Sequence, residues 1–147
     1  SEKPGTFLHV GLTVSNLDRT IAFYETYFGF QVIQRGTFSE DFIGALPQLY
    51  DQPAGAYADF AMISSPDGMV LELFQFSTNE EKKPLRWNQP GYHHVCLRVE
   101  HMQQTYEKMV ADGIPFYFPP RALRAPRDHE YWVFLKDPDG NMIELQG

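Results

Sequence analysis

His9-Val-Gly-Leu-Thr-Val14 returns later in the chain as His94-Val-Cys-Leu-Arg-Val99. A second pair of segments repeats in the same order: Pro66-Asp-Gly-Met-Val-Leu-Glu72-Leu73 and Pro138-Asp-Gly-Asn-Met-Ile-Glu144-Leu145. Each half of the chain therefore begins with a His on an alternating apolar segment and ends with a Glu on another. Self-similarity of this kind indicates repeated structural units. We predict two similar modules with a His and a Glu at equivalent places.

The first half, about residues 7–76, has the pattern of a βαβββ unit. Alternating apolar residues indicate strands, and helical spacing ending at Gly29 indicates a helix. Pro66-Asp67-Gly68 is typical of a tight turn between two strands. The predicted elements are, in order, strand 7–14, helix 17–28, strand 30–35, an irregular stretch 36–55 with a short helix near 41–46, strand 57–64 and strand 69–76.

A polar segment, residues 77–91, is predicted to link this module to a second one, about residues 92–147. The second half repeats the βαβββ order. Its predicted elements are strand 92–99, helix 102–112, strand 114–118, loop 119–128, strand 130–135, a turn at 138–140 and strand 141–145. Three strands in each half follow one another without helices, which disfavours a parallel doubly wound sheet. The predicted fold class is α+β.

Composition limits the range of functions. The chain has 147 residues, enough for one compact domain or two small modules sharing a core. Its net charge of −7 disfavours nucleic acid and anionic membrane as partners, because both attract positive charge. The single cysteine, Cys96, excludes an intrachain disulfide and fits a reducing cytoplasm. Neither a signal peptide nor an apolar run long enough to span a membrane is evident.

The repeated Glu residues carry the chemical argument. Glu72 and Glu144 each lie between large apolar residues on a predicted strand. A carboxylate that is buried there without a partner lowers the stability of the fold by several kcal/mol. Two such carboxylates at equivalent positions, each matched by a His, are explained most simply by a bound cation. We therefore expect one divalent metal ion bound by His9, Glu72, His94 and Glu144.

Imidazole nitrogen and carboxylate oxygen suit Zn, Ni, Co, Fe or Mn. A set of two His and two carboxylates leaves open positions for water or substrate, which is typical of a catalytic site. The metal would polarise a carbonyl group or lower the pKa of bound water. Repeat alignment matches His94, not His93, with His9, so His93 is expected on the opposite face, as a surface residue or a neighbour of the site.

Other residues are candidates for contact with a small-molecule substrate. Phe74 shares the strand face of Glu72, and Cys96 shares that of His94. Cys96 is expected to be a small core residue or part of the pocket wall rather than a nucleophile, because no basic partner is identifiable. The basic cluster of Arg121, Arg124 and Arg127 is either a solvated loop or an anchor for a substrate carboxylate or phosphate.

These motifs resemble the vicinal oxygen chelate superfamily, which includes glyoxalase I, methylmalonyl-CoA epimerase, extradiol dioxygenases, and fosfomycin and bleomycin resistance proteins. The resemblance covers about residues 7–146. It implies tandem βαβββ modules that form a cupped mixed sheet around a divalent metal. It also implies His9, Glu72, His94 and Glu144 as ligands, the set most similar to glyoxalase I. Modules of this kind pair within one chain or swap between two, and a homodimer is expected.

The resemblance implies a lyase or isomerase that chelates a small carbonyl substrate through adjacent oxygens. A proton next to the carbonyl would move through an enediolate or enolate, with Glu144 or Glu72 as the acid–base group. One alternative is a small extradiol-type dioxygenase using Fe(II) or Mn(II). Another is a resistance or sequestration protein that binds an aromatic or antibiotic ligand.

Overall fold

A computed structural model describes residues 3–147. The chain divides into two compact units between Glu81 and Lys82, inside the stretch predicted to be a linker. Each unit contains one four-stranded mixed sheet and few helices, as expected for an α+β fold. No helix among residues 3–147 is long and apolar enough to cross a membrane.

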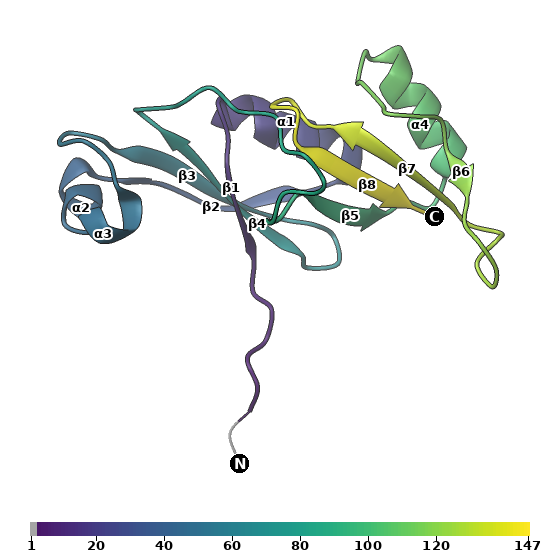
Figure 1. The fold of residues 1–147 in the computed structure, drawn as a ribbon, viewed down its shortest axis with the longest axis horizontal. Coiled ribbons are helices and arrows are strands. Elements are labelled where there is room, and N and C mark those ends of the chain that lie inside the picture. The colour runs from purple at the N-terminus through teal and green to yellow at the C-terminus, as the bar shows by residue number, and fades with distance from the viewer. Residues whose placement is uncertain (1–2) are drawn as a thin grey trace. The chain divides into compact units, whose positions relative to one another are not determined.

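The first unit is built around a sheet with strand order β1-β4-β3-β2. β1 runs parallel to β4, and the other pairs are antiparallel. Residues 3–9 lead into β1 as an extended segment (Figure 1). The elements are β1 (Val10–Thr13), α1 (Leu17–Phe28), β2 (Gln31–Phe38), α2 (Glu40–Gly44), α3 (Pro47–Tyr50), β3 (Ala58–Ser64) and β4 (Val70–Phe76).

Local sequence explains both ends of α1. The side chain of Asn16 accepts a hydrogen bond of 3.0 Å from the backbone N–H of Arg19, which is the usual role of an N-cap residue. Gly29 ends the helix with φ = 68°, a left-handed conformation that favours glycine. The helix buries Leu17, Ile21 and Tyr24 and contacts β3 and β4. One face of the sheet is therefore covered by α1.

The second unit repeats this topology with strand order β5-β8-β7-β6. Its first strand again pairs in parallel with its last. The elements are β5 (His94–Arg98), α4 (Met102–Ala111), β6 (Arg121–Ala122), β7 (Tyr131–Lys136) and β8 (Met142–Gln146). The predicted order of two βαβββ-like units is confirmed.

The predicted strand at 114–118 is wrong. Only Phe116 forms a bridge, to Leu135. The fourth strand of the sheet is instead the short β6, inside the predicted loop 119–128. Proline explains the interruption, because Pro115, Pro119 and Pro120 have no N–H to donate to a strand ladder. The first strand is also shorter than predicted, since Phe7, Leu8 and His9 precede β1.

Both Pro-Asp-Gly turns are held by the residue that precedes them. Ser65 Oγ accepts a hydrogen bond of 2.9 Å from the backbone N–H of Met69. In the second unit, Asp137 Oδ1 accepts from the backbone N–H of Asn141 at 2.8 Å and of Asp139 at 2.9 Å. Burial raises the pKa of Asp137, although these hydrogen bonds oppose the shift. These contacts fix the chain where β4 and β8 begin.

Side-chain alternation along β4 and β8 separates the core from the opposite face. Leu71 and Leu73 are buried in the first unit, and Ile143 and Leu145 are buried in the second. Adjacent residues on a strand point to opposite faces. Glu72 and Glu144 therefore project from the face opposite these core residues.

Candidate metal-binding site

Strand register brings one His and one Glu together in each unit. In the parallel β1–β4 pair, Gly11 lies opposite Glu72, and His9 is two residues before Gly11. Residues two apart on an extended chain point to the same side. His9 Nε2 lies 3.3 Å from Glu72 Oε1.

The second unit reproduces this geometry. Cys96 lies opposite Glu144 in the parallel β5–β8 pair, and His94 is two residues before Cys96. His94 Nε2 lies 3.3 Å from Glu144 Oε1. The two His–Glu pairs occupy equivalent registers in two topologically equivalent sheets.

The distance within each pair fits two donors of one metal ion. Ligands at about 2.0–2.2 Å from a metal, at angles between octahedral and tetrahedral, lie roughly 2.8–3.6 Å apart. The observed separation of 3.3 Å falls in this range for both pairs. Within residues 3–147, no group of three or more His, Cys, Asp or Glu side chains gathers to bind a metal. Each pair, taken by itself, supplies two donor side chains, fewer than the four ligands predicted from the sequence.

All four side chains are partly accessible to solvent. The exposed fractions are 36% for His9 and 22% for Glu72, and 25% for His94 and 14% for Glu144. Partial exposure lets an ion or an exchangeable ligand reach the donor atoms. Glu144 is the less exposed of the two carboxylates.

Glu144 has partners that its counterpart lacks. Gln146 Nε2 donates a hydrogen bond of 2.9 Å to Glu144 Oε2, the carboxylate oxygen that is not paired with His94. The thiol of Cys96 also hydrogen-bonds to Glu144. In the first unit the corresponding positions hold Phe74 and Gly11, neither of which can donate from a side chain.

The environment of Cys96 makes it a poor nucleophile. Partial burial of the thiol raises its pKa to about 11, and the negative charge of Glu144 and the hydrogen bond to it add to the shift. The residue as a whole is exposed, but its sulfur faces the carboxylate. Because the thiolate is the reactive form, the neutral thiol acts here as a hydrogen-bond donor.

The expectation that His93 points to the opposite face is wrong. Its Nδ1 lies 2.7 Å from Nδ1 of His94, and the two ring planes are only 19° apart. His93 precedes β5, so strand alternation does not govern its direction. Trp87 contacts both rings, with centroids 4.2 Å from His93 and 5.3 Å from His94.

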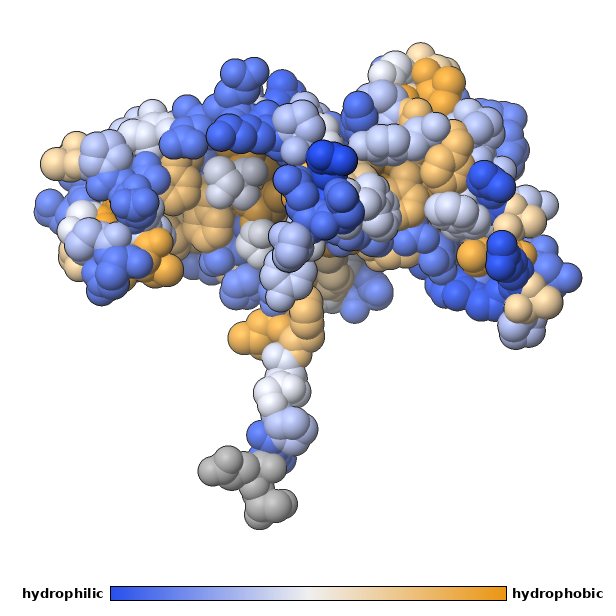
Figure 2. Space-filling model, in the orientation of Figure 1, coloured by the Kyte–Doolittle hydropathy of each residue, from blue (hydrophilic) through white to orange (hydrophobic). Residues whose placement is uncertain are grey.

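An aromatic surface adjoins Glu72 in the first unit. Phe74 shares the strand face of Glu72 and lies opposite Phe60 in the register. Phe38 stacks on Phe60 with centroids 4.7 Å apart and also contacts Phe74. Figure 2 shows apolar side chains gathered over the strands of this unit. Phe74 therefore lies on the same strand face as Glu72, and its contact with a substrate stays a prediction.

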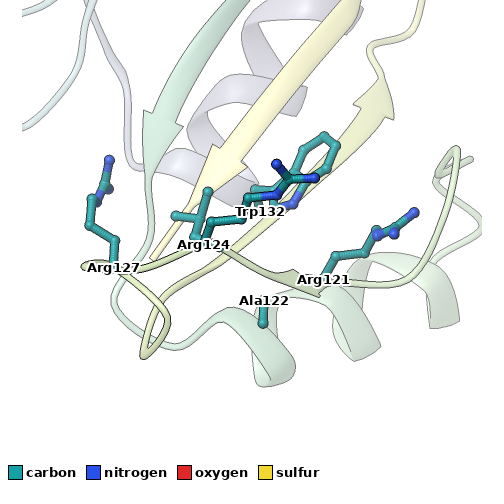
Figure 3. Close-up of a pocket in the computed structure, with 6 residues that line it drawn as sticks. Arg121, Ala122, Arg124, Arg127 and Trp132 are labelled. Atoms are coloured by element: carbon teal, nitrogen blue, oxygen red, sulfur yellow. The ribbon is translucent and has the colours of Figure 1, made fainter.

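The predicted arginine cluster lines a cavity of about 430 Å³ in the second unit (Figure 3). Arg121 and Arg124 form no ion pair with residues 3–147, whereas Arg127 pairs with Glu130 and donates to Gln146 Oε1 at 3.0 Å. The hydrogen bond from Arg127 is the largest of the causes that lower the pKa of Glu130. The complete lining is Arg121, Ala122, Leu123, Arg124, Arg127 and Trp132.

The sheet register relates this cavity to Glu144. Trp132 of the lining lies opposite Gln146, and the next pair on the same face is Phe134 with Glu144. Two residues along a strand span roughly 6.5 Å. The cavity is therefore one side-chain row from the carboxylate. The sequence analysis did not identify Gln146, Trp132 or Trp87. Gln146 could have been identified, because it lies two residues after Glu144 on the same strand and therefore on the same face.

Residues 6–145 match the family described as the Glyoxalase/Bleomycin resistance protein/Dioxygenase superfamily. The chain is 24% identical to a lactoylglutathione lyase of Schizosaccharomyces pombe over 93% of its length, and it spans about half (45%) of that relative. It is 26% identical to a lactoylglutathione lyase of Pseudomonas putida, covering 95% of this chain and 83% of the relative.

Two solved structures show the same fold. A glyoxalase family protein from Bacillus cereus has a TM-score of 0.81 at 21% identity, covering 99% of this chain and 95% of the other. The fosfomycin resistance protein FosX from Listeria monocytogenes, complexed with Mn(II) and sulfate, has a TM-score of 0.65 at 14% identity. That alignment covers 99% of this chain and 93% of FosX.

Proposed function

The chain belongs to the Glyoxalase/Bleomycin resistance protein/Dioxygenase superfamily, and on that premise we propose that it is a metal-dependent lyase or isomerase of the glyoxalase type. One divalent ion is bound per site by the two His–Glu pairs, which are His9 with Glu72 and His94 with Glu144. The pairs that meet at one ion come from a single chain or from two copies of it.

The observation that carries this proposal is the repeated pair geometry. Both His Nε2 atoms lie 3.3 Å from a Glu Oε1, and both pairs arise from the same register in a parallel strand pair. An ion pair on the surface contributes only about 0–1 kcal/mol to the free energy of unfolding. Binding of a metal therefore explains the presence of the same pair in both units better than a contribution to stability does.

When bound, the ion would supply Lewis-acid polarisation of a substrate carbonyl. The residues of the chain supply positioning and proton transfer. Glu144 is the stronger candidate for the acid–base group that takes a proton from the carbon next to that carbonyl, by the resemblance to glyoxalase I. Hydrogen bonds from Gln146 and Cys96 orient its carboxylate, while Glu72 lacks these two donors.

Binding of the substrate is assigned to two surfaces of different character. The guanidinium groups of Arg121 and Arg124 suit a carboxylate or phosphate, because a planar fork of donors matches such anions. Phe74 and its aromatic neighbours suit an apolar group. We therefore expect a small carbonyl compound with an anionic end, such as a hemithioacetal or a carbonyl acid.

The first test measures metal binding. Metal-stripped protein is titrated with Zn²⁺, Ni²⁺ or Mn²⁺ in competition with a chromophoric chelator. We expect one tightly bound ion per site, and affinity lower by orders of magnitude in His9→Ala and in His94→Ala. His101→Ala is the matched control, because His101 is an exposed residue outside both pairs. Control-like affinity in both ligand variants would refute the proposal.

The second test measures the reaction. Metal-loaded protein is incubated in D₂O with the hemithioacetal of glutathione and with small carbonyl acids, and deuterium at the adjacent carbon is followed by NMR. Exchange or isomerisation of one compound supports the assignment. Oxygen uptake with catechols after anaerobic loading with Fe²⁺, without proton exchange, would instead identify a dioxygenase. Tight ligand binding that survives a chelator, without turnover, would identify a binding protein.

A further inference from the structure

His94 has a hydrogen-bond partner on the side of its ring that faces away from Glu144. Its Nδ1 lies 2.7 Å from Nδ1 of His93. At this distance the two nitrogens share one proton, so one must donate and the other accept. The Nε2 of the same ring lies 3.3 Å from Glu144 Oε1. The two nitrogens of His94 therefore face two different partners.

This arrangement matters because a neutral imidazole has only one nitrogen lone pair to offer a metal. For His94 to bind through Nε2, its proton must be on Nδ1. Metal-binding histidines almost always donate that second N–H to an acceptor, which fixes the tautomer and the orientation of the ring. Nδ1 of His93 lies where such an acceptor is needed.

From this geometry we infer that His93 is a positioning residue: it accepts a hydrogen bond from Nδ1–H of His94 and so holds the tautomer whose Nε2 binds the metal. The inference rests on the proposed function for the metal. Without a metal, the Glu144 carboxylate 3.3 Å from Nε2 of His94 favours a proton on that nitrogen, so the acceptor role of His93 belongs to the metal-bound protein.

The surroundings of the pair restrict its movement. Trp87 packs against both imidazoles, and Phe134 lies against His94 with ring centroids 5.0 Å apart. These contacts limit rotation of the rings about their side-chain bonds. The hydrogen bond also selects which nitrogen of His94 carries the proton. Packing against an aromatic ring cannot make that selection.

Among the described residues of the first unit, no histidine corresponds to His93. The residue before His9 is Leu8, which is 75% exposed and has no side-chain acceptor. This difference provides an internal control, because Leu8 and His93 occupy the same position relative to the two proposed ligands. His94 is therefore the more preorganised of the two imidazoles.

Two substitutions separate the hydrogen bond from the packing. His93→Phe keeps an aromatic ring beside Trp87 but removes Nδ1. His93→Asn can place its amide oxygen near the position of Nδ1 and restore the acceptor. We expect the dissociation constant for Zn²⁺ to rise by roughly 10- to 100-fold in His93→Phe, the usual effect of losing a partner of a metal ligand, and by much less in His93→Asn. Leu8→Phe is the matched control and should leave the constant unchanged.

The decisive readout is the tautomer of His93, measured by long-range ¹H–¹⁵N NMR on the Zn²⁺-loaded wild type. We expect His93 to carry its proton on Nε2, which leaves its Nδ1 free to accept from Nδ1–H of His94. A proton on Nδ1 of His93 in the loaded protein would overturn the inference, and so would equal Zn²⁺ affinity in His93→Phe and the wild type. A wild-type protein that binds no divalent ion would instead refute the proposed function.

Discussion

Gln146 donates a hydrogen bond to the Oε2 atom of Glu144, and it accepts one from Arg127 through its own side-chain oxygen. A single amide therefore connects a proposed metal ligand to the loop that lines the arginine cavity. The corresponding residue of the first unit is Phe74, whose ring cannot make either bond. The two carboxylates of otherwise similar units therefore differ in their hydrogen-bond partners, and we predict that they also differ in function.

Replacing Glu144 should separate metal binding from turnover. Glu144→Gln keeps an amide oxygen that can coordinate, so the variant should retain part of its metal affinity. It should lose turnover by roughly 10²–10⁴-fold, the usual contribution of acid–base catalysis. The measurement is solvent deuterium entering the substrate, after full metal occupancy has been confirmed. Exchange at the wild-type rate would remove Glu144 as the base and shift the role to Glu72.

Arg121→Ala and Arg124→Ala should weaken binding of an anionic substrate. Each removes a guanidinium that lines the cavity and pairs with no acidic residue among residues 3–147. A hydrogen bond to a charged group contributes about 1.5–3 kcal/mol, which corresponds to an increase in KM of roughly 10- to 100-fold. Lys82→Ala serves as a control for loss of one positive charge. Unchanged KM in both arginine variants would assign the loop to the solvated surface.

Arg127→Ala should act differently, through Glu144. Arg127 is already paired with Glu130 and bonded to Gln146. Its loss frees Gln146 to turn away from Glu144, so we expect a fall in kcat larger than the rise in KM. Steady-state kinetics of this variant beside Arg124→Ala would show the contrast. Equal changes in KM for the two variants would contradict it.

Alkylation of Cys96 should be slow in the metal-free protein at pH 8. With a pKa of about 11, only a small fraction of the thiol is ionised at that pH. The rate with iodoacetamide should rise with pH toward a midpoint near 11. In Glu144→Gln the midpoint should move down, because one cause of the raised pKa is the negative charge of that carboxylate. A midpoint near the ordinary thiol value in the wild type would show that burial and Glu144 do not control Cys96.

The raised pKa of Asp137 should lower the free energy of unfolding as pH rises. Its pKa is raised in the folded state, so the native protein holds more protons than the unfolded chain between the unfolded and the folded pKa. Stability therefore falls as pH rises through that interval and is constant above it. Asp137→Ser copies the residue at the matching turn, Ser65, and has no carboxylate to ionise.

The test compares urea unfolding of the wild type and Asp137→Ser between pH 3 and 8. The stability of the variant relative to the wild type should improve as pH rises through the acid range. Asp137→Ala is the companion variant, since it loses the acceptor for Asp139 and Asn141 and should cost about 1–3 kcal/mol. A relative stability that does not change with pH would contradict the raised pKa.

The sequence alone determined the repeat, the order of elements in each half and the strand face on which each Glu lies. These properties are local: helix spacing, turn residues and two-residue alternation depend on neighbours along the chain. Alternation between Leu71, Glu72 and Leu73 already predicts that the carboxylate leaves the core. Alignment of the two repeats also predicted that His94, and not His93, is the counterpart of His9.

The tertiary structure decided which residues meet. Parallel pairing of β1 with β4 and of β5 with β8 places each Glu two residues from the register of a His, and no local pattern specifies that register. The contact between His93 and His94 lies just before a strand, where alternation no longer predicts direction. Hydrogen bonds between strands and packing of rings such as Trp87 act across long sequence separations, so only the folded chain reveals their partners.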